Sequence, residues 1–203
     1  MNIESQPIHI AKGFNTFDGL DATGKSTLLE MLHGQLGGII LRNPPEWMRK
    51  YRSFFNKSDV QLRFMYYAFG NFWLDQFVAK PYLEQHDDNN IILQDRSWLS
   101  TFAAHELRGA SKLWLNMGLQ FAKKSVQPKN AFIIHVDTEE RRQRLTRRGI
   151  VSSHDLENLK YDNLIDQKYM QWGGRLAWST VMFDNTNFTP NEACSALAQY
   201  ICK

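Results

Sequence analysis

The stretch GLDATGKS, residues 19–26, places two glycines, a lysine and a serine at the spacing G-x-x-x-x-G-K-[ST]. Glycines let the backbone bend so that successive N–H groups point inward at phosphate oxygens, and a helix that follows adds its positive end. At this spacing Lys25 would reach the β- and γ-phosphates of a nucleoside triphosphate, and the Ser26 hydroxyl would bind Mg²⁺. The sequence therefore predicts a phosphate-binding loop, which we call the P-loop. Its predicted nucleotide contacts are Gly19, Asp21, Ala22, Thr23, Gly24, Lys25, Ser26 and Thr27.

A second polar pair, Asp95 and Arg96, directly follows the apolar run IILQ. A carboxylate at the end of a strand beside the P-loop can hold the Mg²⁺ shell or orient an attacking oxygen, and an adjacent guanidinium can grip a phosphate with two hydrogen bonds. An Asp-Arg pair on its own is more often a surface ion pair. Its position after a strand that should lie beside the first strand favours catalytic roles for both residues, with Asp95 also a metal ligand.

Arginines gather in the segment EERRQRLTRRG, residues 139–149. Arg144, Arg147 and Arg148 recur at three- and four-residue spacing, so a helix would carry them on one face. The helix would start at a sheet end and run into the small polar segment GIVSSHD. This arrangement predicts a lid, about residues 144–156, that carries arginines to a transferring phosphoryl group. We expect Arg147 and Arg148 to act in catalysis and Arg144 to contact the nucleotide.

Short apolar runs alternate with longer helical patterns along the chain, which is typical of parallel strands covered on both faces. The predicted strands cover residues 13–17, 38–42, 91–95, 131–136 and 180–184. The predicted helices cover residues 25–36, 59–85, 110–125, 138–148, 155–172 and 190–202. The alternation predicts an α/β fold: a doubly wound five-stranded parallel sheet with helices on both faces. Ligands of such sheets bind beyond the carboxyl ends of the strands, where the P-loop and Asp95 would meet.

Length and composition limit the class of protein. A chain of 203 residues suits one domain, and a net charge of +3 is too mild for a nucleic-acid partner. No apolar run approaches the roughly 20 residues that a membrane helix needs, so we expect a soluble protein without a membrane partner. Cys194 and Cys202 would lie on one helix, too far apart to bridge each other. Reduced cysteines indicate a cytoplasmic location.

Taken together, these motifs resemble the thymidylate kinases, a family within the nucleoside-monophosphate kinases of the P-loop class. The resemblance rests on FDGLDATGKSTL, LRNPP, DRS, VDTEERRQRLTRRG, DLENLKYDNLIDQKYMQW and DNTNFTPNEA, which together span most of the chain. It implies one P-loop kinase domain over residues 1–203, with ATP as phosphoryl donor, Mg²⁺ as cofactor and a deoxynucleoside monophosphate as acceptor. The expected reaction converts dTMP to dTDP. A homodimer built on the long aromatic helices is also implied.

The resemblance assigns acceptor contacts as well. Asp21 matches the acidic residue that the family uses on the acceptor sugar, Arg42 its arginine near the acceptor phosphate, and Arg96 the arginine of its Asp-Arg pair. The aromatic segment RFMYYAFGNFWLDQF, residues 63–77, matches the helix that lines the family's acceptor pocket. We therefore expect acceptor contacts from this helix as well, and the full predicted set is Asp21, Arg42, Tyr67, Phe69, Phe72 and Arg96.

Three positions depart from the family pattern: Ser97 follows the Asp-Arg pair in place of an aromatic residue, and Phe72 and Leu156 stand where arginines are usual. The missing guanidinium groups can be supplied by Arg49, Arg52 or Arg63. If they are not, two alternatives are open. The acceptor can be an uncharged nucleoside or another small alcohol, or the protein can bind nucleotides without catalysis. A literal N-K-x-D in FNKSD precedes the third strand and no D-x-x-G follows it, which argues against a GTPase.

Overall fold

The computed structural model describes residues 10–85, 90–149 and 162–202. Five strands form one parallel sheet in the order β2-β3-β1-β4-β5. Their bounds are β1 Ile10–Asp18, β2 Ile39–Arg42, β3 Ile92–Asp95, β4 Gln127–His135 and β5 Thr180–Asp184. The predicted five-stranded sheet is confirmed, and β3 lies beside β1 as expected.

β1 and β4 both begin before their predicted bounds, and in β4 the reason is that polar residues occupy the N-terminal half. β4 begins at Gln127 rather than at residue 131, and its register against β1 shifts between Ala11 and Asn15. Asn130 of β4 donates a hydrogen bond of 2.9 Å from Nδ2 to Oδ1 of Asn15, and both side chains are buried. Buried polar groups that satisfy each other in this way are compatible with a central strand, although they hide its apolar pattern.

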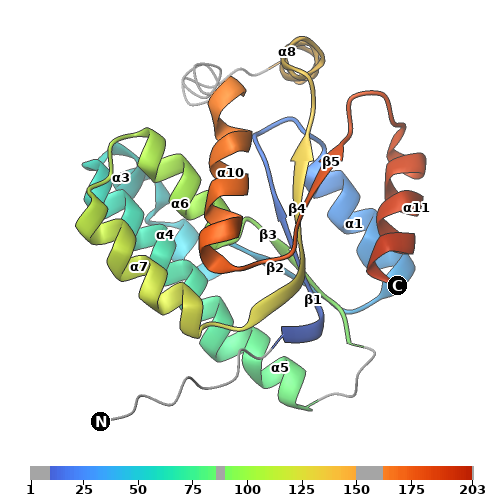
Figure 1. The fold of residues 1–203 in the computed structure, drawn as a ribbon. Helices are drawn as coiled ribbons and strands as arrows, with labels where there is room; N and C mark the ends of the chain where they lie inside the picture. The colour runs from blue at the N-terminus through green and yellow to red at the C-terminus, as the bar shows by residue number, and fades with distance from the viewer. Residues whose placement is uncertain (1–9, 86–89, 150–161, 203) are drawn as a thin grey trace.

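Helices cover both faces of the sheet, as Figure 1 shows. On one face α1 (Lys25–Leu36) packs beside α11 (Pro190–Ile201) against β1 and β4. On the other face lie α4 (Val60–Leu74), α6 (Trp98–Leu107), α7 (Lys112–Lys124) and α10 (Asp162–Leu176), joined in a second core around Phe64, Phe102 and Trp172. The aromatic run continues from α4 through the π-helical turn η1 (Asp75–Ala79) into α5 (Lys80–Gln85), so the predicted helix 59–85 is one helical segment with a π turn.

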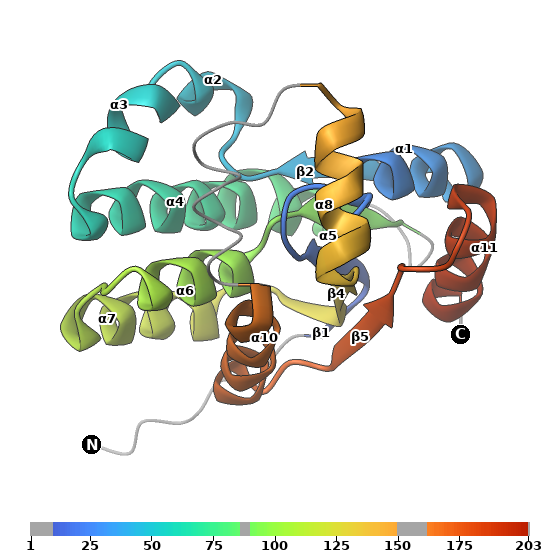
Figure 2. The ribbon, with the colours of Figure 1, turned by 90° about the horizontal axis from the view of Figure 1, so that it is seen from above.

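Within the described ranges, the sequence patterns missed three helices: α2 (Glu46–Arg49), α3 (Arg52–Lys57) and α6. The first two are very short. Helix α6 is buried at nearly every position of its first two turns, so it carries no amphipathic period by which it could be recognised. The remaining helix, α8 (Thr138–Arg147), lies across the carboxyl ends of the strands, seen from above in Figure 2. The expected lid continues beyond α8, and its residues 150–156 lie outside the described residues, as does the 155–161 part of the helix predicted over 155–172.

The register of the sheet aligns the strand ends that carry polar residues. Phe17 pairs with Asp95 across β1 and β3, and Arg42 pairs with Asp95 across β2 and β3. The residues that follow these strands therefore emerge side by side at one edge of the sheet. The sheet brings the P-loop, Arg42 and the Asp95–Arg96 pair together, as its parallel topology predicts.

Candidate active site

The P-loop connects β1 to α1 through a backbone bend that uses left-handed conformations. Gly19, Ala22 and Gly24 have φ angles of +136°, +67° and +93°. A side chain at Gly19 would place its Cβ 2.4 Å from the carbonyl oxygen of Ile134, so the loop can approach β4 only with glycine there. Helix α1 begins at Lys25, directly after Gly24. The loop thus opens onto a helix N-terminus, the arrangement that binds phosphate.

Lys25 is buried inside this bend, with 6% of its side chain exposed. Its Nζ donates hydrogen bonds to the carbonyl oxygen of Leu20 and, at 3.2 Å, to Oγ1 of Thr23. Burial lowers the pKa of Lys25 to about 8, and the nearby Arg96 contributes in the same direction, while Asp21 and Asp95 oppose the shift. A cation held in this way is ready to exchange backbone contacts for the oxygens of a phosphate.

A cavity of about 360 Å³ extends from the P-loop to α3, α4 and α6. The predicted site residues that line it are Asp21, Ala22, Gly24, Lys25, Ser26, Arg42, Tyr67, Asp95, Arg96 and Arg148. Among the described residues, the lining includes seven arginines and one lysine against two carboxylates. The cavity is therefore strongly cationic. Its lining includes the three arginines that the sequence offered as substitutes, Arg49, Arg52 and Arg63, and also Arg108, which no motif indicated.

Arg96 and Asp95 turn toward the P-loop from the end of β3. Arg96 has a left-handed φ of +63°, donates to the carbonyl oxygen of Gly19 at 3.3 Å and forms an ion pair with Asp21. The neighbouring Asp18 holds this turn in place, because its buried carboxylate accepts four hydrogen bonds of 2.6–3.0 Å from Ser97 and Ser100. Burial raises the pKa of Asp18, against the effect of these hydrogen bonds.

Oxygen donors suited to a magnesium ion lie at the same place. Oδ1 of Asp95 is buried and accepts no hydrogen bond from the part of the chain that the structure describes, and Ser26 lies exposed at the start of α1. A carboxylate and a hydroxyl are the hard oxygen ligands that Mg²⁺ uses beside nucleotide phosphates. An unpartnered buried oxygen facing a cationic cavity is the feature that a bound metal ion would satisfy.

A comparison with protein families matches residues 17–187 to the thymidylate kinase family. The chain belongs to the thymidylate kinase family. Among curated proteins, the human mitochondrial UMP-CMP kinase 2 is 26% identical over 174 residues, which cover 82% of this chain and 38% of that protein. The chain thus spans well under half the length of this relative.

The fold agrees with the family assignment. The thymidylate kinase of Ehrlichia chaffeensis has a TM-score of 0.64 to this chain at 19% identity, with 93% of this chain and 97% of that chain covered. At this identity the similarity establishes the α/β P-loop fold. No helix among the described residues is long and apolar enough to span a membrane.

Two aromatic residues of the predicted acceptor set, Phe69 and Phe72, do not line the cavity. Phe69 is half exposed and packs edge-on against Trp47, and Phe72 packs on the core of α6 and α7 with its ring 6.0 Å from that of Phe121. Neither ring lines the cavity. Tyr67 does line it, and its hydroxyl donates to Oδ1 of Asn56 at 2.9 Å. The helix turns by about 100° per residue, so Tyr67 and Phe69 face nearly opposite directions.

The other predicted residues that do not line the cavity lie around it. Thr23 is buried inside the P-loop, with its hydroxyl 3.0 Å from the carbonyl oxygen of Leu20, and Thr27 is exposed on α1. Gly19 lies at the base of the bend. Arg147 is exposed at the end of α8, 3.2 Å from Oε1 of Gln143. Of the arginines predicted for the lid, Arg148, the next residue, lines the cavity.

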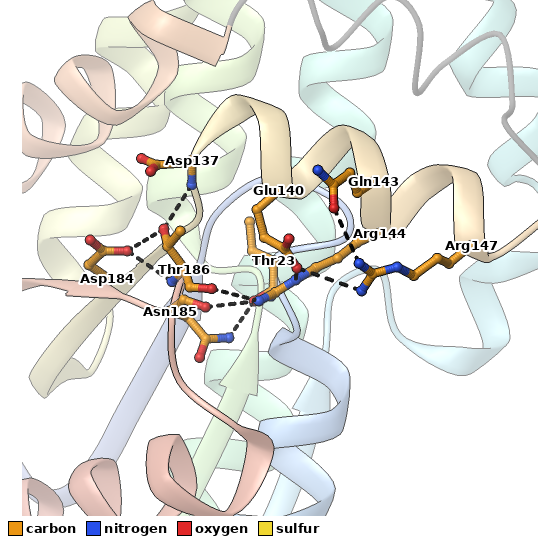
Figure 3. A network of polar contacts seen from close by, with 9 residues as sticks. All are labelled: Thr23, Asp137, Glu140, Gln143, Arg144, Arg147, Asp184, Asn185 and Thr186. Atoms are coloured by element: carbon orange, nitrogen blue, oxygen red, sulfur yellow. Dashed lines mark hydrogen bonds and ion pairs between the residues drawn. The ribbon is translucent and has the colours of Figure 1, made fainter.

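Figure 3 shows how Arg144 joins α8 to the loop after β5. Its guanidinium donates to Glu140 at 2.8 Å and to the carbonyl oxygens of Asn185 and Thr186 at 3.0 and 3.3 Å. The amide of Asn185 in turn donates to the carbonyl oxygen of Thr23 in the P-loop at 2.9 Å. Arg144 therefore acts on the P-loop through Asn185, a residue that the motifs did not indicate.

A second residue that the motifs did not indicate is Arg141, on the turn of α8 before Arg144. Its side chain is 1% exposed, and Nη1 donates to the carbonyl oxygen of Asp21 at 3.3 Å. No motif singled out Arg141 among the arginines of EERRQRLTRRG. Its one sequence signal is the spacing of three and four residues to Arg144 and Leu145, which also face inward.

Proposed function

We propose that this chain transfers the γ-phosphoryl group of ATP to a nucleoside monophosphate, with a deoxypyrimidine nucleotide, dTMP first, as the acceptor. The observation that carries this proposal is one cavity that joins the P-loop lysine to a wall of arginines. Membership in the thymidylate kinase family supports the reaction class. Both relatives named above are described as kinases of pyrimidine nucleotides, which supports the acceptor class.

The arginines favour a phosphorylated acceptor over an uncharged nucleoside. Four arginines line the cavity from elements other than the P-loop: Arg42 at the end of β2, Arg49 of α2, Arg52 of α3 and Arg63 of α4. Guanidinium groups bind phosphate through charge-assisted, often paired hydrogen bonds. Arg42 and Arg49 already pair with Glu30 and Glu46, but a neutral alcohol would bring no negative charge to the other two. The charge that Phe72 does not supply is thus present from other elements.

The residues at the sheet edge divide the chemistry between them. Lys25, Arg96 and Arg148 would balance the negative charge of the phosphates during direct in-line transfer, which depends on positioning and electrostatics. Asp21 would approach the acceptor sugar, and Arg144 would hold the loop beside the nucleotide. Mg²⁺, held by Ser26 and Asp95, would supply further positive charge to the phosphate oxygens.

The decisive experiment measures ADP formation from ATP and Mg²⁺ against a panel of nucleoside monophosphates and the corresponding free nucleosides. We expect turnover with dTMP, weaker turnover with other pyrimidine monophosphates and none with thymidine. The Lys25→Met variant is the control for contaminating kinases. Turnover with nucleosides alone would replace this acceptor assignment, and turnover with no member of the panel would support a nucleotide-binding protein without catalysis.

We also propose a homodimer through α4 and α7. Exposed apolar side chains recur at four-residue spacing on both helices, and α4 packs against α7. They are Met65 and Phe69 on α4 and Leu113, Met117 and Phe121 on α7. Sedimentation equilibrium of the wild type and of a Met117→Lys variant tests this proposal: a dimer that the charge dissociates is expected, and a monomeric wild type contradicts it.

A further inference from the structure

Two carbonyl groups of the P-loop are held by side chains that lie outside the phosphate cavity. Arg141 of α8 donates to the carbonyl oxygen of Asp21 at 3.3 Å, and Asn185, after β5, donates to that of Thr23 at 2.9 Å. Both donors are buried, with 1% and 5% of their surface exposed, and neither lines the large cavity. Their contacts are therefore with the back of the loop rather than with a ligand in that cavity.

The geometry of the peptide bond gives these contacts a consequence on the other side of the loop. In a trans peptide the C=O of one residue and the N–H of the next point in opposite directions. When the Asp21 carbonyl is held toward Arg141, the N–H of Ala22 must point away from α8. The Thr23 carbonyl and the N–H of Gly24 are related in the same way. Ala22 and Gly24 both line the cavity.

The residue between the two held carbonyls has a backbone conformation that needs support. Ala22 adopts a left-handed φ of +67°, which costs a residue with a Cβ about 1 kcal/mol. Such conformations persist where the surroundings fix them. Here the peptide before Ala22 and the peptide after Thr23 are both anchored to neighbouring elements.

Asn185 is itself fixed in position, as Figure 3 shows. Its backbone N–H donates to the carbonyl oxygen of His135 at 2.8 Å, and its own carbonyl accepts from Arg144 at 3.0 Å. The side-chain amide lies so close to the loop that a Cβ on Gly24 would be 2.9 Å from Nδ2. The loop after β5 thus presents a rigid donor to the P-loop.

We propose that Arg141 and Asn185 are positioning residues that orient the Asp21–Ala22 and Thr23–Gly24 peptides so that their N–H groups face the phosphates of the nucleotide. This inference rests on the proposed nucleotide binding and deepens it. It assigns to α8 a second role besides carrying Arg148: its first two turns set the shape of the phosphate cradle. The ligand class that these peptides serve is the triphosphate or diphosphate of a nucleotide.

Asn185→Ala is the cleaner test because it removes one neutral donor and leaves the charge of the site unchanged. We expect the Kd for ADP, measured by titration calorimetry with Mg²⁺, and the KM for ATP to rise about tenfold, the scale of one backbone hydrogen bond to a charged group. The KM for the acceptor monophosphate should stay within twofold. Arg141→Met, which keeps the length of the buried side chain, should also raise the Kd for ADP and the KM for ATP. In both variants nucleotide affinity should fall while acceptor affinity stays nearly unchanged.

Matched controls come from exposed neighbours. Asn187→Ala lies two residues further along the same loop, and Arg142→Ala lies next to Arg141 on α8, where it pairs with Glu139 at 3.5 Å. Neither should change the Kd for ADP. The proposal is wrong if folded Asn185→Ala, checked by circular dichroism, binds ADP as the wild type does, or if both KM values rise equally. A wild type that binds ADP but phosphorylates no acceptor would refute the proposed reaction alone and leave this test intact.

Discussion

The buried lysine of the P-loop predicts a dependence of nucleotide binding on pH. Burial lowers the pKa of Lys25 to about 8, so the folded protein without nucleotide loses this positive charge near pH 8. Arginines stay charged throughout this range, and phosphate groups with a second pKa near 6 are already ionised. Lys25 is thus the group in the P-loop whose charge changes between pH 7 and pH 9.5.

The expected size of the effect follows from the fraction of protein that carries the proton. With a pKa of about 8, roughly nine-tenths of the molecules are protonated at pH 7 and roughly one-tenth at pH 9. If the protonated form is the one that binds, the apparent Kd for ATP with Mg²⁺ rises about tenfold over these two pH units, and roughly threefold more by pH 9.5. Titration calorimetry at four pH values measures this directly.

The same proton has the opposite effect on folding. The folded state releases it near pH 8, whereas the unfolded chain keeps it up to the ordinary lysine pKa of 10.5. Over that interval the unfolded chain binds more protons, so the free energy of unfolding increases with pH, by at most about 3 kcal/mol. Urea unfolding of the wild type and of Lys25→Met at pH 7 and pH 10 isolates this contribution, because the variant lacks the titrating group.

A nucleotide affinity that stays constant from pH 7 to pH 9.5 would refute the assignment of a low pKa to Lys25. So would the same pH slope in Lys25→Met, since that slope would have to come from another group. Weaker binding together with greater stability at high pH is expected of a buried cation whose ligand is an anion. General unfolding at alkaline pH would instead lower both the nucleotide affinity and the free energy of unfolding.

Three further substitutions test other parts of the site. Arg148→Ala should lower kcat at least 100-fold and leave ATP affinity within threefold, because Arg148 lines the cavity. Arg147→Ala should give a smaller loss, because Arg147 does not line the cavity, and equal losses in steady-state assays would contradict this ranking. Phe72→Arg should reduce the free energy of unfolding in urea by about 2 kcal/mol, because position 72 faces the core of α6 and α7. It should not lower the KM for the acceptor, and a lower KM would mean that this position reaches the cavity after all. Asp18→Asn should lower the free energy of unfolding by about 3 kcal/mol, because an amide can no longer accept all four hydrogen bonds from Ser97 and Ser100. An unchanged unfolding midpoint in urea would show that these contacts are dispensable.

The parts of the site that could be predicted are those whose geometry is local. The P-loop motif fixes which residues bend and which begin the helix, and the structure has the left-handed φ angles at Gly19 and Gly24. The Asp95–Arg96 pair follows an apolar strand, so the parallel sheet alone places it beside the P-loop. In both cases a few neighbouring residues determine the position, and the sheet topology supplies the rest.

The parts that could not be predicted depend on contacts between distant segments. Asn185 contacts Thr23 across 162 positions and Arg141 contacts Asp21 across 120, and no spacing in the sequence encodes either contact. Arg49 and Arg52 could be named from the sequence as possible substitutes, but they reach the cavity because two short helices, which were not predicted, follow β2. Short helices have weak periodic signals, so their direction, and the charge that they bring, is set by tertiary packing.

The direction in which Phe72 points from α4 explains why the lack of an arginine at this position matters less than the sequence suggested. Phe72 occupies the place of an expected arginine, and on the sequence alone that loss left an uncharged acceptor open as an alternative. Tyr67 faces the cavity, and Phe72, five residues further along α4, lies about 140° around the helix and packs toward Phe121. The absence of an arginine at position 72 therefore does not reduce the positive charge of the cavity, which comes from its other arginines. Arg49, Arg52 and Arg63 line that same cavity from α2, α3 and α4. Under the proposed function they would bind the acceptor phosphate, as a different set of arginines from the one that the family pattern implies.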